Sequence, residues 1–156
     1  MLDKYVLMHK DIPVGDLTYD TSTKKFAFEK YDSIKDRNHL PLGMYRFKNW
    51  NIDYKPNHDD IVFWLEDRVV PKERANIDEI LKVMGLIDYD FWELCRRTRA
   101  MCMEDYFWLS KGEKYEEVHM RYLAENNRLY DTPIPFEVED YEPEYKIVNN
   151  RLVKNE

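Results

Sequence analysis

The stretch 60–109, DIVFWLEDRVVPKERANIDEILKVMGLIDYDFWELCRRTRAMCMEDYFWL, decides the fold that we expect for this chain. Signals that begin and end helices follow each other closely in it, and it holds three of the four tryptophans. Asp59 or Asp60 can cap a first helix that runs to about Arg68. That helix must end there, because the residue before Pro71 is pushed out of the α-helical region.

Two further helices are expected inside this stretch. Asn76 and Glu79 have the spacing of a capping box, with Asn in place of the usual Ser or Thr, and Gly85 is placed to end that helix in the left-handed conformation. One apolar stripe of this helix comprises Ile77, Ile80, Leu81 and Met84. Asp88 is expected to open the next helix, whose apolar face comprises Phe91, Leu94, Cys95 and Thr98.

The residues before this stretch predict strands. Segments 4–9, 12–19 and 25–31 have the composition of β-strands, and polar turns separate them. Pro13 cannot donate a hydrogen bond to a neighbouring strand, so the second strand lies at an edge or starts near that residue. Gly15 suggests a bulge. Three short antiparallel strands make a meander, and its apolar face must be covered by other elements.

The remaining segments complete the expected fold. Residues 32–59 are expected to be irregular, with 39–43 as an extended segment that ends in a turn and 45–58 as loop or short strand. Residues 106–109 are read as an aromatic strand, and residues 114–124 as a last helix. The class is therefore α+β, with a small antiparallel meander packed against three to four helices. We expect one domain at 1–125, followed by an acidic, proline-containing extended tail at 126–156.

The tail itself has few apolar groups, which is typical of extended or mobile chain. Near its end, the turn Asn149-Asn150 separates residues 145–148 from residues 151–154, and this pattern predicts a small hairpin.

Composition excludes several function classes. The 156 residues suit one domain, and only 4 are glycine, so a glycine-rich phosphate-binding loop is absent. The net charge of −7 gives no general basic footprint for nucleic acid. No apolar run reaches the roughly 18–20 residues of a membrane span. The 2 cysteines make no disulfide framework and no signal peptide opens the chain, so we expect a reduced, cytoplasmic protein.

No catalytic or metal site is predicted. The 4 histidines lack the short spacing of a zinc motif, and no pair of acidic residues is placed by sequence in a common cleft. Cys95 lies on the apolar face of its helix, which favours a buried small hydrophobe over a reactive thiol. We therefore assign no catalytic residue, no metal and no cofactor.

A basic set allows two interpretations. It comprises Arg68, Lys72, Arg74, Arg96, Arg97 and Arg99. These side chains could form a patch for nucleic acid or for an acidic partner. Alternatively they are solvated helix ends that pair with neighbouring carboxylates, and the sequence favours this second interpretation. The carboxylates available for such pairs are Glu66, Asp67, Glu73 and Glu93.

The tryptophans also have two interpretations. At the spacing of Trp64, Trp92 and Trp108, packing in the core is favoured over exposure as binding anchors. Trp50 lies in the irregular segment and is the better candidate for an exposed ring. If the chain binds a partner, the candidate contact residues are Trp50, Trp64, Arg68, Arg74, Arg96 and Arg97.

Four segments together resemble a known family. They are YVLMHKDIPVGDL at 5–17, HLPLG at 39–43, FWLEDRVVPKERANIDEILKVMGL at 63–86 and MCMEDYFWL at 101–109. In this order they resemble the N-terminal portion of HipA-like proteins of Firmicutes, over residues 4–122. In that family the segment precedes a kinase-like domain, whereas this sequence contains no glycine-rich phosphate-binding loop and no DFG-type triplet.

The resemblance implies a regulatory role without catalysis. In the wider family, the small N-terminal subdomain can be a separate polypeptide that binds and restrains the kinase. We therefore expect a non-enzymatic, antitoxin-like protein that binds a HipA-like kinase or another protein. The alternative is a nucleic-acid-associated regulator, or an acidic DNA mimic that blocks a nucleic-acid-binding protein, as mobile elements encode. No catalytic residue is carried over from the family.

Overall fold

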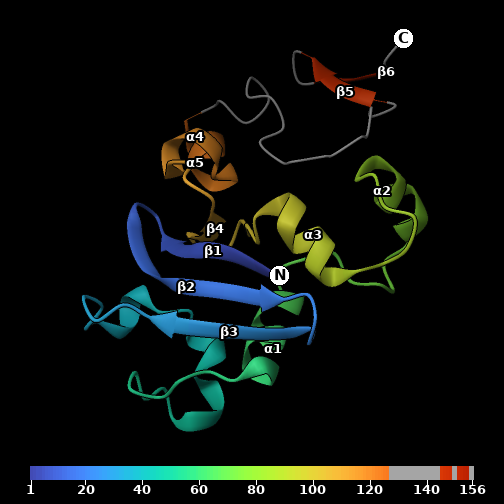
Figure 1. Ribbon diagram of the computed structural model, residues 1–156. Coiled ribbons are helices and arrows are strands. Elements are labelled where there is room, and N and C mark those ends of the chain that lie inside the picture. Colours follow the sequence, from blue (N-terminus) through green and yellow to red (C-terminus); the bar gives the residue numbers. More distant parts are fainter. Residues whose placement is uncertain (127–144, 149–150, 155–156) are drawn as a thin grey trace.

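The computed structural model describes residues 1–126, 145–148 and 151–154, and in these residues the predicted α+β fold is confirmed. A four-stranded sheet has the order β3-β2-β1-β4, with every neighbouring pair antiparallel (Figure 1). Its strands are β1 (Leu2–His9), β2 (Ile12–Asp20), β3 (Lys25–Lys30) and β4 (Phe107–Ser110). The first three form the predicted meander, and β4 joins it from a distant part of the sequence.

Outside the strands, the described chain contains five short α-helices. The α-helices are α1 (His58–Glu66), α2 (Ile77–Val83), α3 (Phe91–Thr98), α4 (Tyr115–Val118) and α5 (Met120–Glu125). The segment 32–57, expected to be irregular, contains no strand and forms three single 3₁₀ turns, two of which overlap the segment 39–43 that was expected to be extended. These are η1 (Arg37–His39), η2 (Leu42–Met44) and η3 (Arg46–Lys48).

The second strand is central, so the edge position considered for it is wrong. The other alternative holds, because β2 begins one residue before Pro13 and its pairing with β3 starts only at Gly15. The predicted bulge is present: Leu7 pairs with Gly15 and Met8 with Pro13, which leaves Val14 as the extra residue. A Cβ atom on Gly15 would lie 2.4 Å from the carbonyl oxygen of Glu29, so only glycine fits.

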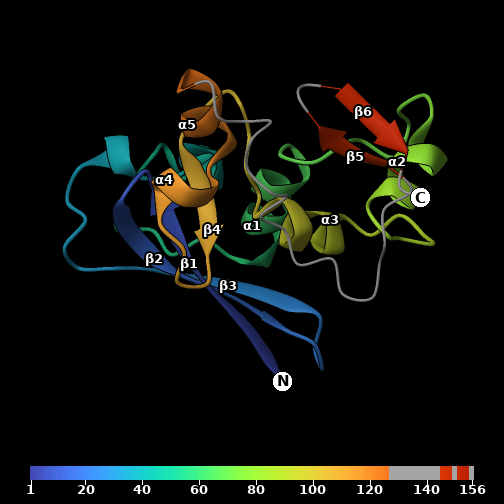
Figure 2. The ribbon, with the colours of Figure 1, turned by 90° about the horizontal axis from the view of Figure 1, so that it is seen from above.

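The sheet buries apolar groups on both faces, but unequally. One face carries the main core, which α1 and α3 cover together with the η2 segment (Figure 2). The sheet residues of this core are Tyr5, Leu7, Val14, Leu17, Phe26, Phe28, Phe107 and Leu109. On the other face, Trp108 of β4 packs with Tyr115 and Val118 of α4. Because β4 is covered on both faces, all four of its residues are buried.

Two predicted helix starts are wrong in their capping residue, and a third has the predicted residue without the predicted capping interaction. Asn57 caps α1, and Asp60 completes its capping box from the third helical position instead of serving as the cap. Asn76 precedes α2 in a left-handed conformation, with φ of 63°, and makes no side-chain cap. Asp90, not Asp88, caps α3 by accepting hydrogen bonds from the backbone of Trp92 and Glu93. The predicted left-handed Gly85 after α2 is confirmed, with φ of 78°.

The predicted last helix at 114–124 is divided into α4 and α5. His119 between them has an extended backbone, with φ of −71° and ψ of 121°. Its side chain is fully buried against the sheet, where Nδ1 accepts from the backbone N–H of Arg121 and Nε2 lies 3.4 Å from the carbonyl oxygen of Phe107. Burial of this ring therefore interrupts the helix.

The predicted hairpin near the chain end is confirmed. Strands β5 (Tyr145–Val148) and β6 (Arg151–Lys154) pair antiparallel, and Val148 pairs with Arg151. The rest of the expected acidic tail, at 127–144, 149–150 and 155–156, lies outside the described residues.

Candidate binding surface and pocket

The segment around η3 presents aromatic rings to solvent. Phe47 is 64% exposed and Trp50 is 42% exposed, in agreement with the sequence analysis for Trp50. The guanidinium of Arg46 lies 5.1 Å from the centre of the Phe47 ring and 4.9 Å from that of Phe63 on α1. The surface therefore combines two exposed rings with a cation. We call Arg46, Phe47, Lys48 and Trp50 the η3 surface.

The backbone of the η3 surface is tightly held. The carbonyl oxygen of Tyr45 accepts hydrogen bonds from the N–H groups of both Lys48 and Trp50, and Lys48 in turn accepts one from Asn51. Asn49 and Trp50 have φ of 52° and 60°, the left-handed region that a bulky residue rarely adopts. The Trp50 ring is thus displayed by a strained but fixed turn.

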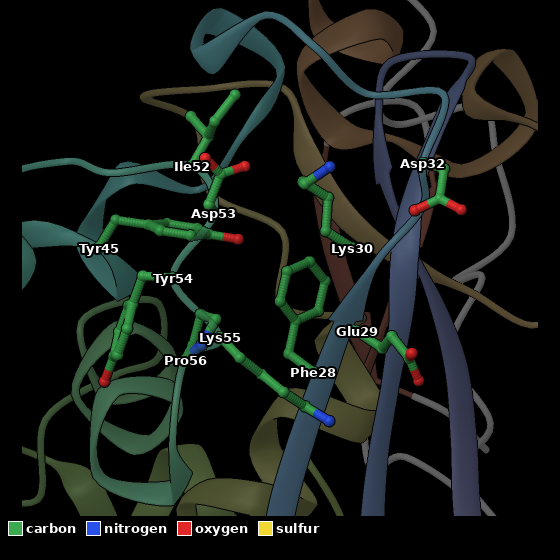
Figure 3. A pocket seen from close by; sticks show the side chains of 10 residues that line it. All are labelled: Phe28, Glu29, Lys30, Asp32, Tyr45, Ile52, Asp53, Tyr54, Lys55 and Pro56. Atoms are coloured by element: carbon green, nitrogen blue, oxygen red, sulfur yellow. The ribbon is translucent and has the colours of Figure 1, made fainter.

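A pocket lies beside this segment, between β3 and residues 45–56. Its cavity volume is about 250 Å³. The wall from β3 consists of Phe28 and Lys30, and the opposite wall of Tyr45, Ile52 and Pro56 (Figure 3). Because side chains alternate along a strand, Phe28 and Lys30 share one face of β3 and Glu29 lies on the other, exposed face.

The hydroxyl group of Tyr45 is the unusual feature of this pocket. The Tyr45 side chain is fully buried, yet its hydroxyl has no hydrogen-bond partner among the described residues. Figure 3 shows this hydroxyl directed toward the Phe28 ring, and neighbouring atoms enclose it almost completely. Burial raises the pKa of Tyr45 to about 12, so at neutral pH the group keeps its proton and can donate a hydrogen bond.

The neighbouring Tyr54 provides a contrast. Its hydroxyl points away from the pocket and donates a 2.5 Å hydrogen bond to the buried carboxylate of Asp60 (Figure 3). Asp60 also accepts from the backbone N–H of Asn57, which closes the capping box of α1. Of these two neighbouring tyrosines, Tyr54 therefore has a complete hydrogen bond and Tyr45 has none among the described residues.

Two predicted contact residues are buried and cannot offer a surface. Trp64 is 7% exposed and packs in the main core. The Arg68 side chain is 5% exposed and makes a bidentate salt bridge with Asp105, with both N–O distances 2.7 Å. Arg68 also donates to the carbonyl oxygens of Ala100 and Phe107, at 2.6 and 3.0 Å. Its role in this structure is to tie α1 to the segment before β4.

The other predicted contact residues are scattered. Arg96 and Arg97 both pair with Glu93, at 2.8 and 2.7 Å, as the second interpretation of the basic set predicts. Arg74 is exposed in the turn before α2. The arginines are thus mostly engaged with carboxylates of their own chain. Trp50 is the predicted contact residue that the structure places on the η3 surface.

Sequence reasoning missed Tyr45, Phe47 and Lys30. The one available signal was the cluster of aromatic residues without helical or strand periodicity at 45–58. The interpretation of Cys95 as a buried small hydrophobe is confirmed, since it has no exposed surface and burial raises the pKa of its thiol.

Neither a metal site nor a membrane-spanning helix is found among the described residues. Within the described residues, no three His, Cys, Asp or Glu side chains gather where they could hold a metal ion. None of the described helices is both long enough and apolar enough to cross a bilayer. Comparison of the chain with protein-family models, with curated proteins and with solved structures finds no match.

Proposed function

We propose that this chain is a non-enzymatic regulatory protein that binds another protein through the η3 surface. The single observation that carries the proposal is the fixed display of Trp50 and Phe47 to solvent. Trp and Arg are enriched among the residues that dominate binding energies. A turn that already holds its ring in place also loses less conformational entropy on binding.

The chemistry of the η3 surface indicates the kind of partner. Arg46 and Lys48 are exposed beside the rings, and the Arg46 guanidinium lies against two of them. Such a surface suits an apolar recess with an acidic rim, where the cations meet carboxylates and the rings are buried. This complementarity contrasts with the net charge of −7 of the whole chain.

For the identity of the partner we propose a HipA-like kinase, on the basis of the sequence resemblance described above. The chain then acts in an antitoxin-like manner. The nucleic-acid alternative has less support, because Arg68, Arg96 and Arg97 already face carboxylates of their own chain.

The test is titration calorimetry of the purified full chain against a HipA-like kinase encoded beside it. Trp50→Gly removes the ring and relieves the left-handed strain, so the fold is retained while binding falls at least about tenfold. Ile87→Ser is the matched control, since Ile87 is 96% exposed and lies outside the η3 surface. We expect this variant to bind like the parent chain.

Two results would contradict the proposal. One is a kinase that binds Trp50→Gly and the parent chain equally well. The other is the absence of binding to any product of the neighbouring genes by a chain that circular dichroism shows to be folded.

A further inference from the structure

Two histidine side chains meet where the end of β1 lies beside η1. The Nδ1 atoms of His9 and His39 are 3.0 Å apart, which is hydrogen-bond distance, although the two residues are 30 positions apart in the sequence. A hydrogen bond between two ring nitrogens requires that one carry a proton and that the other present its lone pair. The His9–His39 contact therefore exists only while at least one of the two Nδ1 atoms is free of a proton.

The two rings can gain one proton together without losing this contact. In the neutral pair, one Nδ1 donates and the other accepts. When the donor ring also gains a proton at its Nε2, its Nδ1–H still donates, and the hydrogen bond becomes charge-assisted. A second proton has to enter at the accepting Nδ1, so it breaks the hydrogen bond and leaves two positive rings in contact.

His9 is held firmly by the sheet. It pairs with Ile12 of β2 and with Phe107 of β4. Its ring also stacks on the Phe107 ring, with the ring centres 4.4 Å apart and an angle of 24° between the planes. His9 is therefore the fixed side of the contact.

The η1 turn, in contrast, has few connections to the sheet. Residues 35–38 are all exposed, and none of the three residues of η1 is buried. The capping hydrogen bonds of η1 remain within the segment itself. The nearest buried side chains along the chain are Ile34 and Leu40. Between these two anchors, His39 is the residue of η1 whose side chain bonds to the sheet.

The groups around the pair keep it closed at neutral pH. Burial lowers the pKa of His9 most, and the neighbouring His39 and Lys10 act in the same direction, whereas the Asp105 carboxylate opposes them. Because the pKa of His9 lies below 6.5 as a result, this ring is mostly neutral at pH 7. The titratable and charged groups on the elements around the pair are Lys10 in the turn after β1, Asp105 and Tyr106 before β4, and Asp36 and Arg37 in the η1 segment.

We propose that the His9–His39 contact is a pH-sensitive switch, which holds η1 against the sheet at neutral pH and releases residues 35–39 when acid protonates both rings. Two N–H donors that face each other at 3.0 Å repel, and η1 has no buried side chain to keep it in place. The contact lies outside the η3 surface, so this inference stands apart from the proposed partner binding.

The experiment follows the full chain by NMR from about pH 8 to about pH 4. The Cε1–H signals of His9 and His39 report protonation, and the ¹H–¹⁵N heteronuclear NOE of residues 35–39 reports their mobility on the picosecond-to-nanosecond timescale. We expect the pair to titrate in two steps at least about one pH unit apart. The NOE of residues 35–39 should stay high through the first step and fall with the second.

Three variants separate the switch from other effects of acid. In His39→Gln, the carboxamide can either donate to the His9 Nδ1 or accept from it, so residues 35–39 should stay ordered throughout the titration. His39→Ala leaves His9 without a partner, so these residues should be mobile at every pH. His119→Gln is the control for the buried histidine that titrates elsewhere, and it should release residues 35–39 at the same pH as the parent chain.

Any of three outcomes would overturn the proposal. His9 and His39 could titrate independently in the parent chain, residues 35–39 could keep a high NOE after both rings are protonated, or His39→Gln could show the same acid transition as the parent chain. The proposal also fails if circular dichroism shows that the whole chain unfolds before residues 35–39 are released. None of these measurements involves a partner protein, so they test this inference independently of the proposed function.

Discussion

Arg68 and Tyr45 are both buried polar side chains, but they differ in their hydrogen bonding. The Arg68 guanidinium makes two hydrogen bonds to Asp105 and two to backbone carbonyl oxygens, and it stacks 4.4 Å from the centre of the Trp64 ring. The Tyr45 hydroxyl has no partner among the described residues. One group ties elements together, whereas the other is enclosed without a hydrogen bond.

The difference affects the stability of the fold. Burial alone would raise the pKa of Asp105, but the hydrogen bonds and charge of Arg68 outweigh it and hold that pKa below its usual value. A stabilising contact of this kind needs no further explanation. The Tyr45 hydroxyl makes no such contact among the described residues, and an unpaired buried hydroxyl costs stability. The predictions below test this contrast, beginning with the paired groups.

The largest effect is expected at Arg68. In Arg68→Met, the carbonyl oxygens of Ala100 and Phe107 lose their donor and the partly buried Asp105 loses its counter-charge. We expect the free energy of unfolding to fall by roughly 4 kcal/mol in urea titrations. Arg74→Met, at an exposed site, should change it by less than about 0.5 kcal/mol. If both variants lost only a similar small amount of unfolding free energy, Arg68 would not be a stabilising residue of the fold.

His119 is a buried side chain whose Nδ1 hydrogen bond can form only while the ring is neutral. Burial lowers its pKa from 6.5 to about 4, and its Nδ1 already accepts a backbone hydrogen bond and cannot take a proton without losing it. The unfolded chain binds this proton first, so stability is full above pH 6.5 and is lost as the pH falls toward 4. The expected loss is roughly 3 kcal/mol.

The measurement for His119 is urea unfolding at several pH values between 7 and 4. His119→Gln has no titrating ring, so its stability should vary much less across this window. An equally steep dependence in this variant would assign the effect to other groups.

An intermediate effect is expected at Tyr54. Tyr54→Phe removes the hydrogen bond to the buried Asp60 carboxylate, which is part of the α1 capping box. Because the acceptor is charged, we expect a loss of about 2 kcal/mol in urea unfolding. A variant as stable as the parent chain would show that solvent replaces the lost donor.

Sequence patterns predicted much of this fold, because its strands have local signals. The alternation around Phe26 and Phe28 fixes which face of β3 is buried, and Gly15 marked the bulge. Helix starts were harder, since several polar residues precede each helix and tertiary contacts select among them. Asn57 caps α1 because the Asp60 carboxylate accepts a hydrogen bond from the Asn57 backbone N–H and so completes the capping box.

The sites were less predictable for a different physical reason. Arg68 and Asp105 are 37 residues apart, and their pairing depends on how α1 meets the segment before β4. The unpaired state of the Tyr45 hydroxyl is a property of its complete surroundings. The spacing of residues along the sequence cannot indicate that a buried group lacks a hydrogen-bond partner.

The most direct test of the central claim is the unfolding free energy of Tyr45→Phe without ligand, measured in urea beside the parent chain. If the hydroxyl is buried and unpaired, its removal leaves the fold as stable as before or more stable by up to about 1 kcal/mol. A loss of about 2 kcal/mol, equal to that expected for Tyr54→Phe, would mean that the hydroxyl has a partner in the folded chain. That result would contradict the account of the pocket.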